Sequence, residues 1–171
     1  MRIEIGDWQV RSYRIDDAPS LARHANNRNI SRNMRDTFPY PYTLSDAHDW
    51  ISLVMQQSPE ANFAIASADE VIGGIGLMFR DDIHRRSAEI GYWLGEPFWG
   101  QGIATAALRA VTDHAFANYD LARLEAFVFE WNPASMRVLE KVGYVLEGNL
   151  RRSITKDGQT IDAFLFARVL E

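Results

Sequence analysis

The stretch WGQGIATAAL, from Trp99 to Leu108, decides the fold, because two glycines there lead directly into an alanine-rich helical pattern. A strand pattern, AEIGYWL from Ala88 to Leu94, comes just before it. The first turn of a helix leaves backbone N–H groups without intrahelical partners, and the helix dipole adds partial positive charge at that end. Gly100 and Gly102 have no side chain to obstruct a ligand. The stretch therefore predicts a phosphate-binding turn between a strand and a helix.

Two other phosphate-binding motifs fit this turn poorly. The dinucleotide-binding pattern Gly-x-Gly-x-x-Gly is incomplete, because Thr105 occupies the third glycine position. A P-loop requires a lysine directly after the glycines, and the nearest lysine, Lys141, lies far down the chain. A tight strand-to-helix connection that binds nothing is the remaining structural alternative. NAD-dependent oxidoreduction stays open as a function, although the missing glycine argues against it.

Apolar periodicity and turn residues predict a chain of mixed strands and helices. The expected strands are Trp8–Arg14, Asn62–Ala68, Val71–Phe79, Ala88–Leu94, Arg123–Glu130, Tyr144–Ser153 and Ile161–Leu170. The expected helices run from Asp16 or Asp17 towards Asn27, from Ser45 to about Gln57, from about Gly102 to Asn118, and from Pro133 to just before Gly143. Asn29 to Thr43 is expected to be a loop, and the glycines at 73, 74 and 76 indicate a bulge or a close backbone approach.

Composition predicts one ordinary globular domain spanning residues 1–171, with 47% hydrophobic and 24% charged residues. The absence of cysteine excludes disulfides, thiolate metal sites and a cysteine nucleophile. The four histidines are scattered singly, so no metal site is expected. No apolar run approaches the roughly 20 residues of a membrane span, and the N-terminus lacks a signal-peptide core. We therefore expect a cytoplasmic protein that does not bind membranes.

The net charge of −5 argues against nucleic acid as a partner, because no stretch concentrates lysine or arginine. An acidic surface instead suits a cationic partner such as an amine.

Four segments together resemble the GNAT superfamily of acyl-CoA-dependent N-acetyltransferases, in particular its RimJ/RimL-like branch. They are AEIGYWL from Ala88, WGQGIATAAL from Trp99, NPASMRVLEKVGY from Asn132 and GQTIDAFLFARVL from Gly158, in the order and at the spacing of that family. The first half of the chain matches only loosely. The resemblance implies an α+β fold of three α/β/α layers. Its sheet would be mixed and mostly antiparallel, with about seven strands and about four helices.

In this family the fourth and fifth strands splay apart, and the pantetheine arm of coenzyme A (CoA) lies in the gap. Here those strands are Ala88–Leu94 and Arg123–Glu130. The resemblance thus implies acetyl-CoA as the acyl donor, and no metal. The residues that it assigns to CoA binding are Tyr92, Trp93, Leu94, Trp99, Gly100, Gln101, Gly102, Ile103, Ala104, Thr105 and Asn132.

Glu89 is the first candidate for a catalytic residue, because acetyl transfer requires an unprotonated amine. Strand alternation places Glu89 on the face opposite Ala88 and Ile90, and several family members carry a catalytic glutamate on this strand. An ordinary solvated or salt-bridged glutamate is the alternative.

Ser135 is the candidate that protonates or hydrogen-bonds the departing thiolate, because the RimJ/RimL-like branch often has a serine there. Capping of the helix explains Ser135 and Asn132 about as well. Many other family members use a tyrosine further along this helix, where Leu139 stands here. A further departure is Trp99, where the wider family prefers glutamine or arginine, and Gln101 also replaces a frequent basic residue.

Phe38, Tyr40 and Tyr42 are candidates to line the acceptor pocket, although aromatic residues beside prolines more often anchor a loop. The expected acceptor is a protein N-terminal α-amino group, or else a small amine such as a polyamine, an amino acid or an aminoglycoside. A non-catalytic acyl-CoA sensor is the alternative that a buried salt bridge at Glu89 would favour. The oligomeric state is expected to be a monomer or a homodimer.

Overall fold

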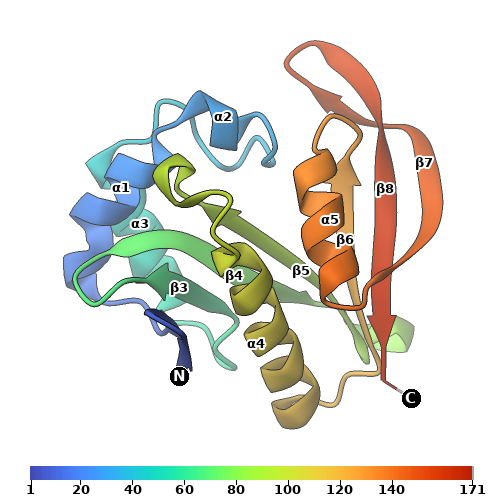
Figure 1. Cartoon of the computed structure of the whole chain (residues 1–171), viewed down its shortest axis with the longest axis horizontal. Helices are drawn as coiled ribbons and strands as arrows, with labels where there is room; N and C mark the ends of the chain where they lie inside the picture. Colours follow the sequence, from blue (N-terminus) through green and yellow to red (C-terminus); the bar gives the residue numbers. More distant parts are fainter. Residues whose placement is uncertain (171) are drawn as a thin grey trace.

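The computed structural model describes residues 1–170 as one eight-stranded sheet with helices on both faces (Figure 1). The strand order is β1-β2-β3-β4-β5-β6-β8-β7. The strands are β1 (Arg2–Ile5), β2 (Trp8–Arg11), β3 (Asn62–Ala66), β4 (Val71–Phe79), β5 (Ser87–Leu94), β6 (Arg123–Phe129), β7 (Val145–Lys156) and β8 (Gln159–Val169). The helices are α1 (Ala18–Ala25), α2 (Arg28–Ser31), α3 (Leu44–Val54), α4 (Ile103–Asn118) and α5 (Pro133–Lys141), with 3-10 turns at Ile15–Asp17, Asp82–His84 and Glu96–Phe98.

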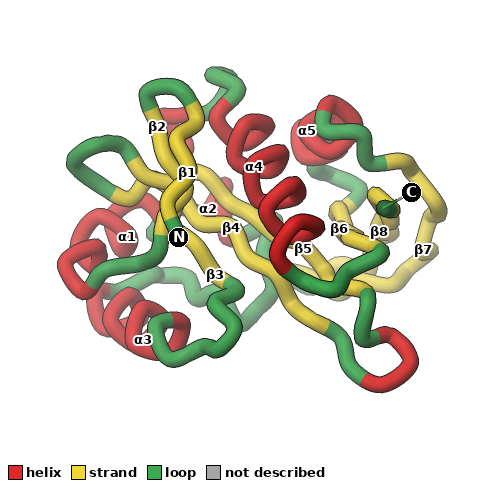
Figure 2. The backbone as a smooth tube through the Cα atoms, turned by 90° about the horizontal axis from the view of Figure 1, so that it is seen from below, coloured by secondary structure: helices red, strands yellow, loops and turns green. Residues whose placement is uncertain are grey.

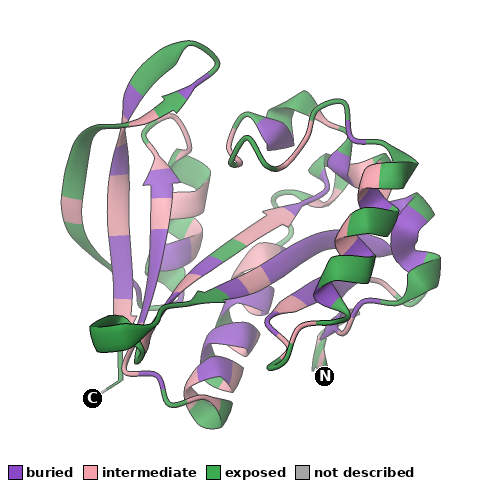
Figure 3. Ribbon diagram, turned by 180° about the vertical axis from the view of Figure 1, so that it is seen from behind, coloured by how far each residue is buried: buried purple, intermediate pink, exposed green. Residues whose placement is uncertain are grey.

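The helices form two layers that enclose the sheet (Figure 2). Successive side chains of β3 point to opposite faces of the sheet, so each face packs against a different helix layer. Ala64 packs with α1 and α3, whereas its neighbours Phe63 and Ile65 pack with α4. Both faces of β3 and β4 are therefore buried, while the edge strand β7 is mostly exposed (Figure 3). This arrangement confirms the three-layer fold. Within residues 1–170, no helix combines the length and hydropathy that a membrane span needs.

The sheet splits between β5 and β6, which is the predicted splay. These parallel strands pair only where Ser87–Glu89 lies beside Arg123–Glu125. Beyond Glu89, β5 pairs with β4 alone and β6 pairs with β8 alone. The sheet has eight strands rather than seven, because the expected strand Trp8–Arg14 ends at Arg11 and forms a hairpin with Arg2–Ile5.

A short helix, α2, interrupts the segment that the sequence predicts to be a loop from Asn29 to Thr43, so that prediction is wrong at Asn29–Ser31. The Asn27 side chain accepts a hydrogen bond from the Asn29 amide at 2.8 Å and caps this helix. Four residues are too few to show the helical periodicity of apolar positions.

The other helices and the glycine-rich strand follow the predicted pattern with small differences. On α4 the buried stripe includes Ile103, Ala107 and Val111, while Ala106 and Ala110 lie at its half-buried edge. Strand β4 has the close approach that its glycines indicate, because a Cβ on Gly74 would lie 2.6 Å from the Tyr13 hydroxyl. The register of β3 against β4 also shifts between Ile65 and Ala66.

A buried ion pair joins β2 to the start of α1. Arg11 donates from Nη1 to Asp17 Oδ2 and from Nη2 to Asp17 Oδ1, both at 2.8 Å, and the two side chains are only 6% and 7% exposed. Asp17 Oδ2 also accepts the Arg14 amide at 2.7 Å. Removing one partner of such a pair leaves the other charge buried without compensation.

We therefore expect Asp17→Asn to lower the free energy of unfolding by about 3 kcal/mol, because the Arg11 guanidinium loses its counter-charge. Urea unfolding followed by circular dichroism measures this change. Asp16→Asn is the matched control, since Asp16 is exposed and its neutralisation removes no buried partner. Equal midpoints for the two variants would contradict the assigned role of the pair.

Candidate active site

A groove of about 2130 Å³ follows the split in the sheet and is lined by both halves of the chain. Its walls come from the α2–α3 segment, β4, β5, the start of α4, β6, α5 and the end of β7. All of the site residues predicted from the sequence line this groove except Tyr40 and Gln101. The predicted residues thus gather in one place although they lie up to a hundred positions apart in the chain.

The turn before α4 has an open row of backbone donors. Gly100 and Gly102 adopt left-handed φ angles of 76° and 78°, and a Cβ on either would meet nothing within 4 Å. Within residues 1–170, no amide from residue 100 to residue 105 donates a hydrogen bond, and the first bond of α4 runs from Ala106 to Gly102. The Trp99 indole donates to the Leu94 carbonyl at 2.7 Å and ties the turn to the end of β5. An anion would find these amides free.

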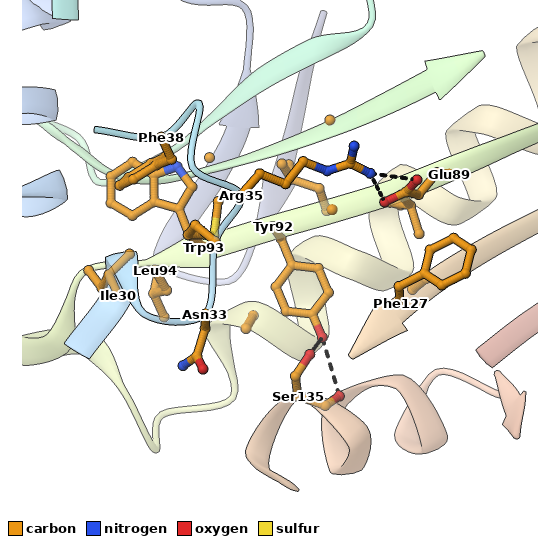
Figure 4. Close-up of a pocket in the computed structure, with 18 of the residues that line it drawn as sticks. Ile30, Asn33, Arg35, Phe38, Glu89, Tyr92, Trp93, Leu94, Phe127 and Ser135 are labelled. Carbon is orange, nitrogen blue, oxygen red and sulfur yellow. Dashed lines mark hydrogen bonds and ion pairs between the residues drawn. The ribbon is translucent and has the colours of Figure 1, made fainter. Parts of the chain in front are cut away.

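Glu89 lies at the point where β5 and β6 separate, and it forms an ion pair with Arg35 (Figure 4). Arg35 Nη2 lies 2.7 Å from Oε1 and 2.8 Å from Oε2 of Glu89. The carboxylate side chain is 17% exposed, whereas the arginine side chain is 61% exposed. The pair is therefore open to solvent on the arginine side. No sequence signal predicts this contact, because Arg35 belongs to the irregular segment between α2 and α3.

Ser135 and Tyr92 meet on the other side of β5 (Figure 4). The Ser135 hydroxyl lies 2.8 Å from the Tyr92 hydroxyl, which also donates to the Ser135 carbonyl at 3.3 Å. Burial raises the pKa of Tyr92 well above its ordinary value, so this phenol stays protonated. Asn132 caps α5 by accepting the Ser135 amide at 3.4 Å. The Ser135 hydroxyl therefore contacts Tyr92 and does not itself cap the helix.

Two aromatic residues of the α2–α3 segment, Phe38 and Tyr42, both anchor this segment and line the groove. Phe38 packs against Tyr42 and Trp93, with ring centroids 5.1 and 5.7 Å apart. Tyr42 is buried in the core of α1 and α3, which fits a loop anchor. Tyr40 lies outside the groove and is exposed, with the Arg28 guanidinium 5.7 Å from its ring centroid.

The segment 28–36 reaches across the groove to the C-terminal half of the chain. Trp131 donates from its indole to Asn33 Oδ1 at 2.9 Å, and the Arg32 guanidinium lies 5.2 Å from the Trp131 ring centroid. Buried Lys156 contacts Asp36 at 2.8 Å. Sequence reasoning missed these residues, because each contact joins positions about a hundred residues apart and no local pattern encodes it.

Known proteins resemble the chain in sequence. An uncharacterized N-acetyltransferase, p20, from Bacillus licheniformis is 32% identical over 164 residues, which cover 92% of this chain and 90% of p20. Spermidine N(1)-acetyltransferase from Escherichia coli (strain K12) is 30% identical over 155 residues, covering 88% of this chain and 80% of that protein. Ribosomal-protein-serine acetyltransferase from the same strain is 35% identical over 109 residues, covering 64% of this chain and 60% of that protein.

The fold also matches solved structures. Mycobacterium smegmatis RimJ in complex with CoA-disulfide superposes with a TM-score of 0.83 at 28% identity, covering 95% of this chain and 81% of that chain. The acetyltransferase (GNAT) domain family matches residues 9–145, which include the separating strands β5 and β6, the glycine turn before α4, and α5. The chain belongs to the GNAT family of N-acetyltransferases.

Proposed function

We propose that this chain transfers the acetyl group of acetyl-CoA to a primary amine by direct attack in a ternary complex. The observation that carries the proposal is the row of free amides from residue 100 to residue 105, set beside the split between β5 and β6. Such amides at a helix N-terminus suit a diphosphate. On the side facing β6, the backbone of Ile90–Leu94 has no strand partner and offers hydrogen bonds to a pantetheine arm. Both features support acetyl-CoA as the donor.

Bound acetyl-CoA supplies a thioester whose carbonyl carbon an amine attacks, forming a C–N bond and breaking the C–S bond. Glu89 is the group that takes the proton released by the amine, since it is the carboxylate at the opening of the split. The Ser135 hydroxyl, held by Tyr92, donates a hydrogen bond to the departing sulfur. Glu89 releases the proton taken from the amine to solvent, and the CoA thiolate takes its proton from solvent. Glu89 and Tyr92 lie on opposite faces of β5, so the two groups approach the gap from its two sides.

A protein N-terminal α-amino group is the acceptor that we favour. Its pKa is about 8, against about 10.4 for a lysine-type amine, so deprotonation at neutral pH costs about 3 kcal/mol less. Arg35 contacts both oxygens of Glu89, so an acceptor amine must displace this arginine to reach the carboxylate. The ribosomal-protein-serine acetyltransferase relative acts on a protein, whereas the spermidine acetyltransferase relative points to a small amine.

A non-catalytic acyl-CoA sensor is the second candidate, and the Arg35–Glu89 ion pair is the observation that favours it. Ion pairs with one exposed partner contribute little to stability, about 0–1 kcal/mol, so an entering ammonium group can displace Arg35. The relatives named as N-acetyltransferases support the enzyme over the sensor.

Substitution of Gly102 tests the placement of the diphosphate. Gly102→Val is expected to weaken acetyl-CoA binding by at least about tenfold in calorimetry, because the branched side chain enters the open space in front of the amides. Gly6→Val is the matched control, since Gly6 has a similar φ of 76°, equal open space and a place in the β1–β2 turn. Both variants lose about 1–3 kcal/mol of stability to backbone strain. Unchanged affinity of Gly102→Val would count against the placement.

Substitution of Glu89 tests the base. Glu89→Gln is expected to lower kcat/KM about 100-fold near pH 7, because the amine must then lose its proton to water. The loss shrinks as the pH rises towards the pKa of the amine, which a pH profile of thiol release measures. Arg35→Gln breaks the same ion pair but keeps the carboxylate, and its kcat/KM stays within about threefold of the unsubstituted protein. Equal, pH-independent losses in the two variants would assign the pair a purely structural role.

An acceptor screen tests the substrate class. A peptide with a free N-terminal serine is expected to support faster thiol release than spermidine at pH 7, because its amine is more easily deprotonated. The same peptide with an acetylated N-terminus is the control. Faster release with spermidine would replace the protein acceptor by a polyamine, and release with neither amine would favour the sensor.

A further inference from the structure

Gly91 stands in the middle of β5, although neither its backbone nor its packing requires a glycine. Its φ lies outside the left-handed region that favours glycine. Within residues 1–170, a Cβ on Gly91 would meet no atom within 4 Å beyond its chain neighbours. Glycine in the interior of a strand costs stability relative to alanine, because it loses more conformational freedom on folding. The fold therefore gives no reason for a glycine at this position.

The glycines of the neighbouring strand β4 differ in this respect. A Cβ on Gly74 would lie 2.6 Å from the Tyr13 hydroxyl and 2.8 Å from Trp93 Nε1. A Cβ on Gly76, which is the register partner of Gly91, would clash with the side-chain oxygen of Asn62. Neighbouring side chains thus require a glycine at both positions of β4, whereas the space above Gly91 is left open.

The space above Gly91 belongs to the groove, on the face of the sheet that carries Glu89. Gly91 is exposed and lines the groove. Since side chains alternate along β5, one at position 91 would point to the same face as Glu89 and Trp93. Ile90 and Tyr92 point to the opposite face, where they pack on the core that includes α4. Strand β6 pairs with β5 no further than Glu89, so it does not cover Gly91.

Aromatic rings and one ion pair surround this space (Figure 4). At one end Trp93 packs against Phe38, with ring centroids 5.7 Å apart. At the other end stands Glu89 with its partner Arg35. Phe127 of β6 lines the groove from across the split. These walls are apolar except at the ion pair, so they suit the carbon skeleton of an amine whose nitrogen meets the carboxylate.

We propose that Gly91 determines which acceptors fit the groove, because the space above it receives the side chain of the acceptor's first residue. This inference rests on the proposed function, since it takes the groove as the site of acetyl transfer to an N-terminal amine. Two residues of a strand span about 7 Å, so an ammonium group at Glu89 brings the side chain on its own Cα level with Gly91. The site therefore takes an N-terminal residue with an uncharged side chain and discriminates by the size of that side chain.

Three peptides that differ only at the first residue, which is glycine, serine or leucine, test this assignment with Gly91→Ala. The added methyl group occupies part of the space without straining the backbone. The loss of kcat/KM, measured by thiol release, is expected to grow with the size of the first side chain. It should be at least about tenfold larger for the leucine peptide than for the glycine peptide.

Two further measurements separate this role from a structural one. Gly91→Ala is expected to raise the urea midpoint of unfolding, because alanine loses less conformational freedom in a strand. The affinity for acetyl-CoA in calorimetry is expected to stay within about threefold, since a side chain at position 91 points to the face opposite α4.

Gly148→Ala is the matched control. Gly148 lies in β7, lacks a left-handed φ and has equally open space at its Cβ position, but it does not line the groove. This variant is expected to keep the ratio of kcat/KM between the leucine and glycine peptides.

Several outcomes overturn the assignment. Equal losses for the three peptides, or a lower urea midpoint, would make Gly91 a structural residue, and no loss would leave the space without a role. Weaker binding of acetyl-CoA by Gly91→Ala would assign the space to the carrier. All of these results leave the proposed function standing. Thiol release with none of the peptides, from unsubstituted protein that binds acetyl-CoA, would overturn transfer to a protein N-terminus and this inference with it.

Discussion

The end of the β5–β6 pairing at Glu89 is the constraint on which the rest of this structure depends. Two parallel strands that stay paired would close the sheet and leave no passage between its faces. Because they separate, the edge of β5 from Ile90 to Leu94 is unpaired, and a groove opens there. Buried backbone groups need partners, so an unpaired edge at this place is expected to take hydrogen bonds from a ligand.

One apolar core joins the two halves of the sheet on the α4 face, since it contains Ile65 of β3, Val111 of α4 and Leu124 of β6. Strands β6, β8 and β7 form an antiparallel unit of their own. Across the groove, the contacts of segment 28–36 are hydrogen bonds, ion pairs and one cation–π contact. Polar contacts with exposed partners are weak individually. The turn before α4 and helix α5 are likewise held by single hydrogen bonds, to β5 and to α4 respectively.

Much of the fold follows from local signals in the sequence. The strands from Val71 onwards and the helix from Ile103 to Asn118 appear where alternation, glycines and caps predict them. The splay and the α/β/α layers came from the family resemblance and are confirmed. The short α2 helix and the β1–β2 hairpin were missed, because four-residue elements carry too little periodicity. In the site, Arg35, Asn33 and Trp131 were missed, since each acts through a partner distant in the chain.

The sequence by itself determined the glycine turn before α4 and the residues that flank it, because glycines, a strand and a helix that follow one another in the chain impose their geometry locally. The sequence also determined which face of β5 carries Glu89, since side chains along a strand alternate between the two faces of the sheet. Only the tertiary structure decided that Arg35 contacts Glu89, that Tyr92 holds Ser135, and that α5 is joined to α4 through Arg109. Those contacts depend on how distant segments pack around the split, and no local pattern records that packing.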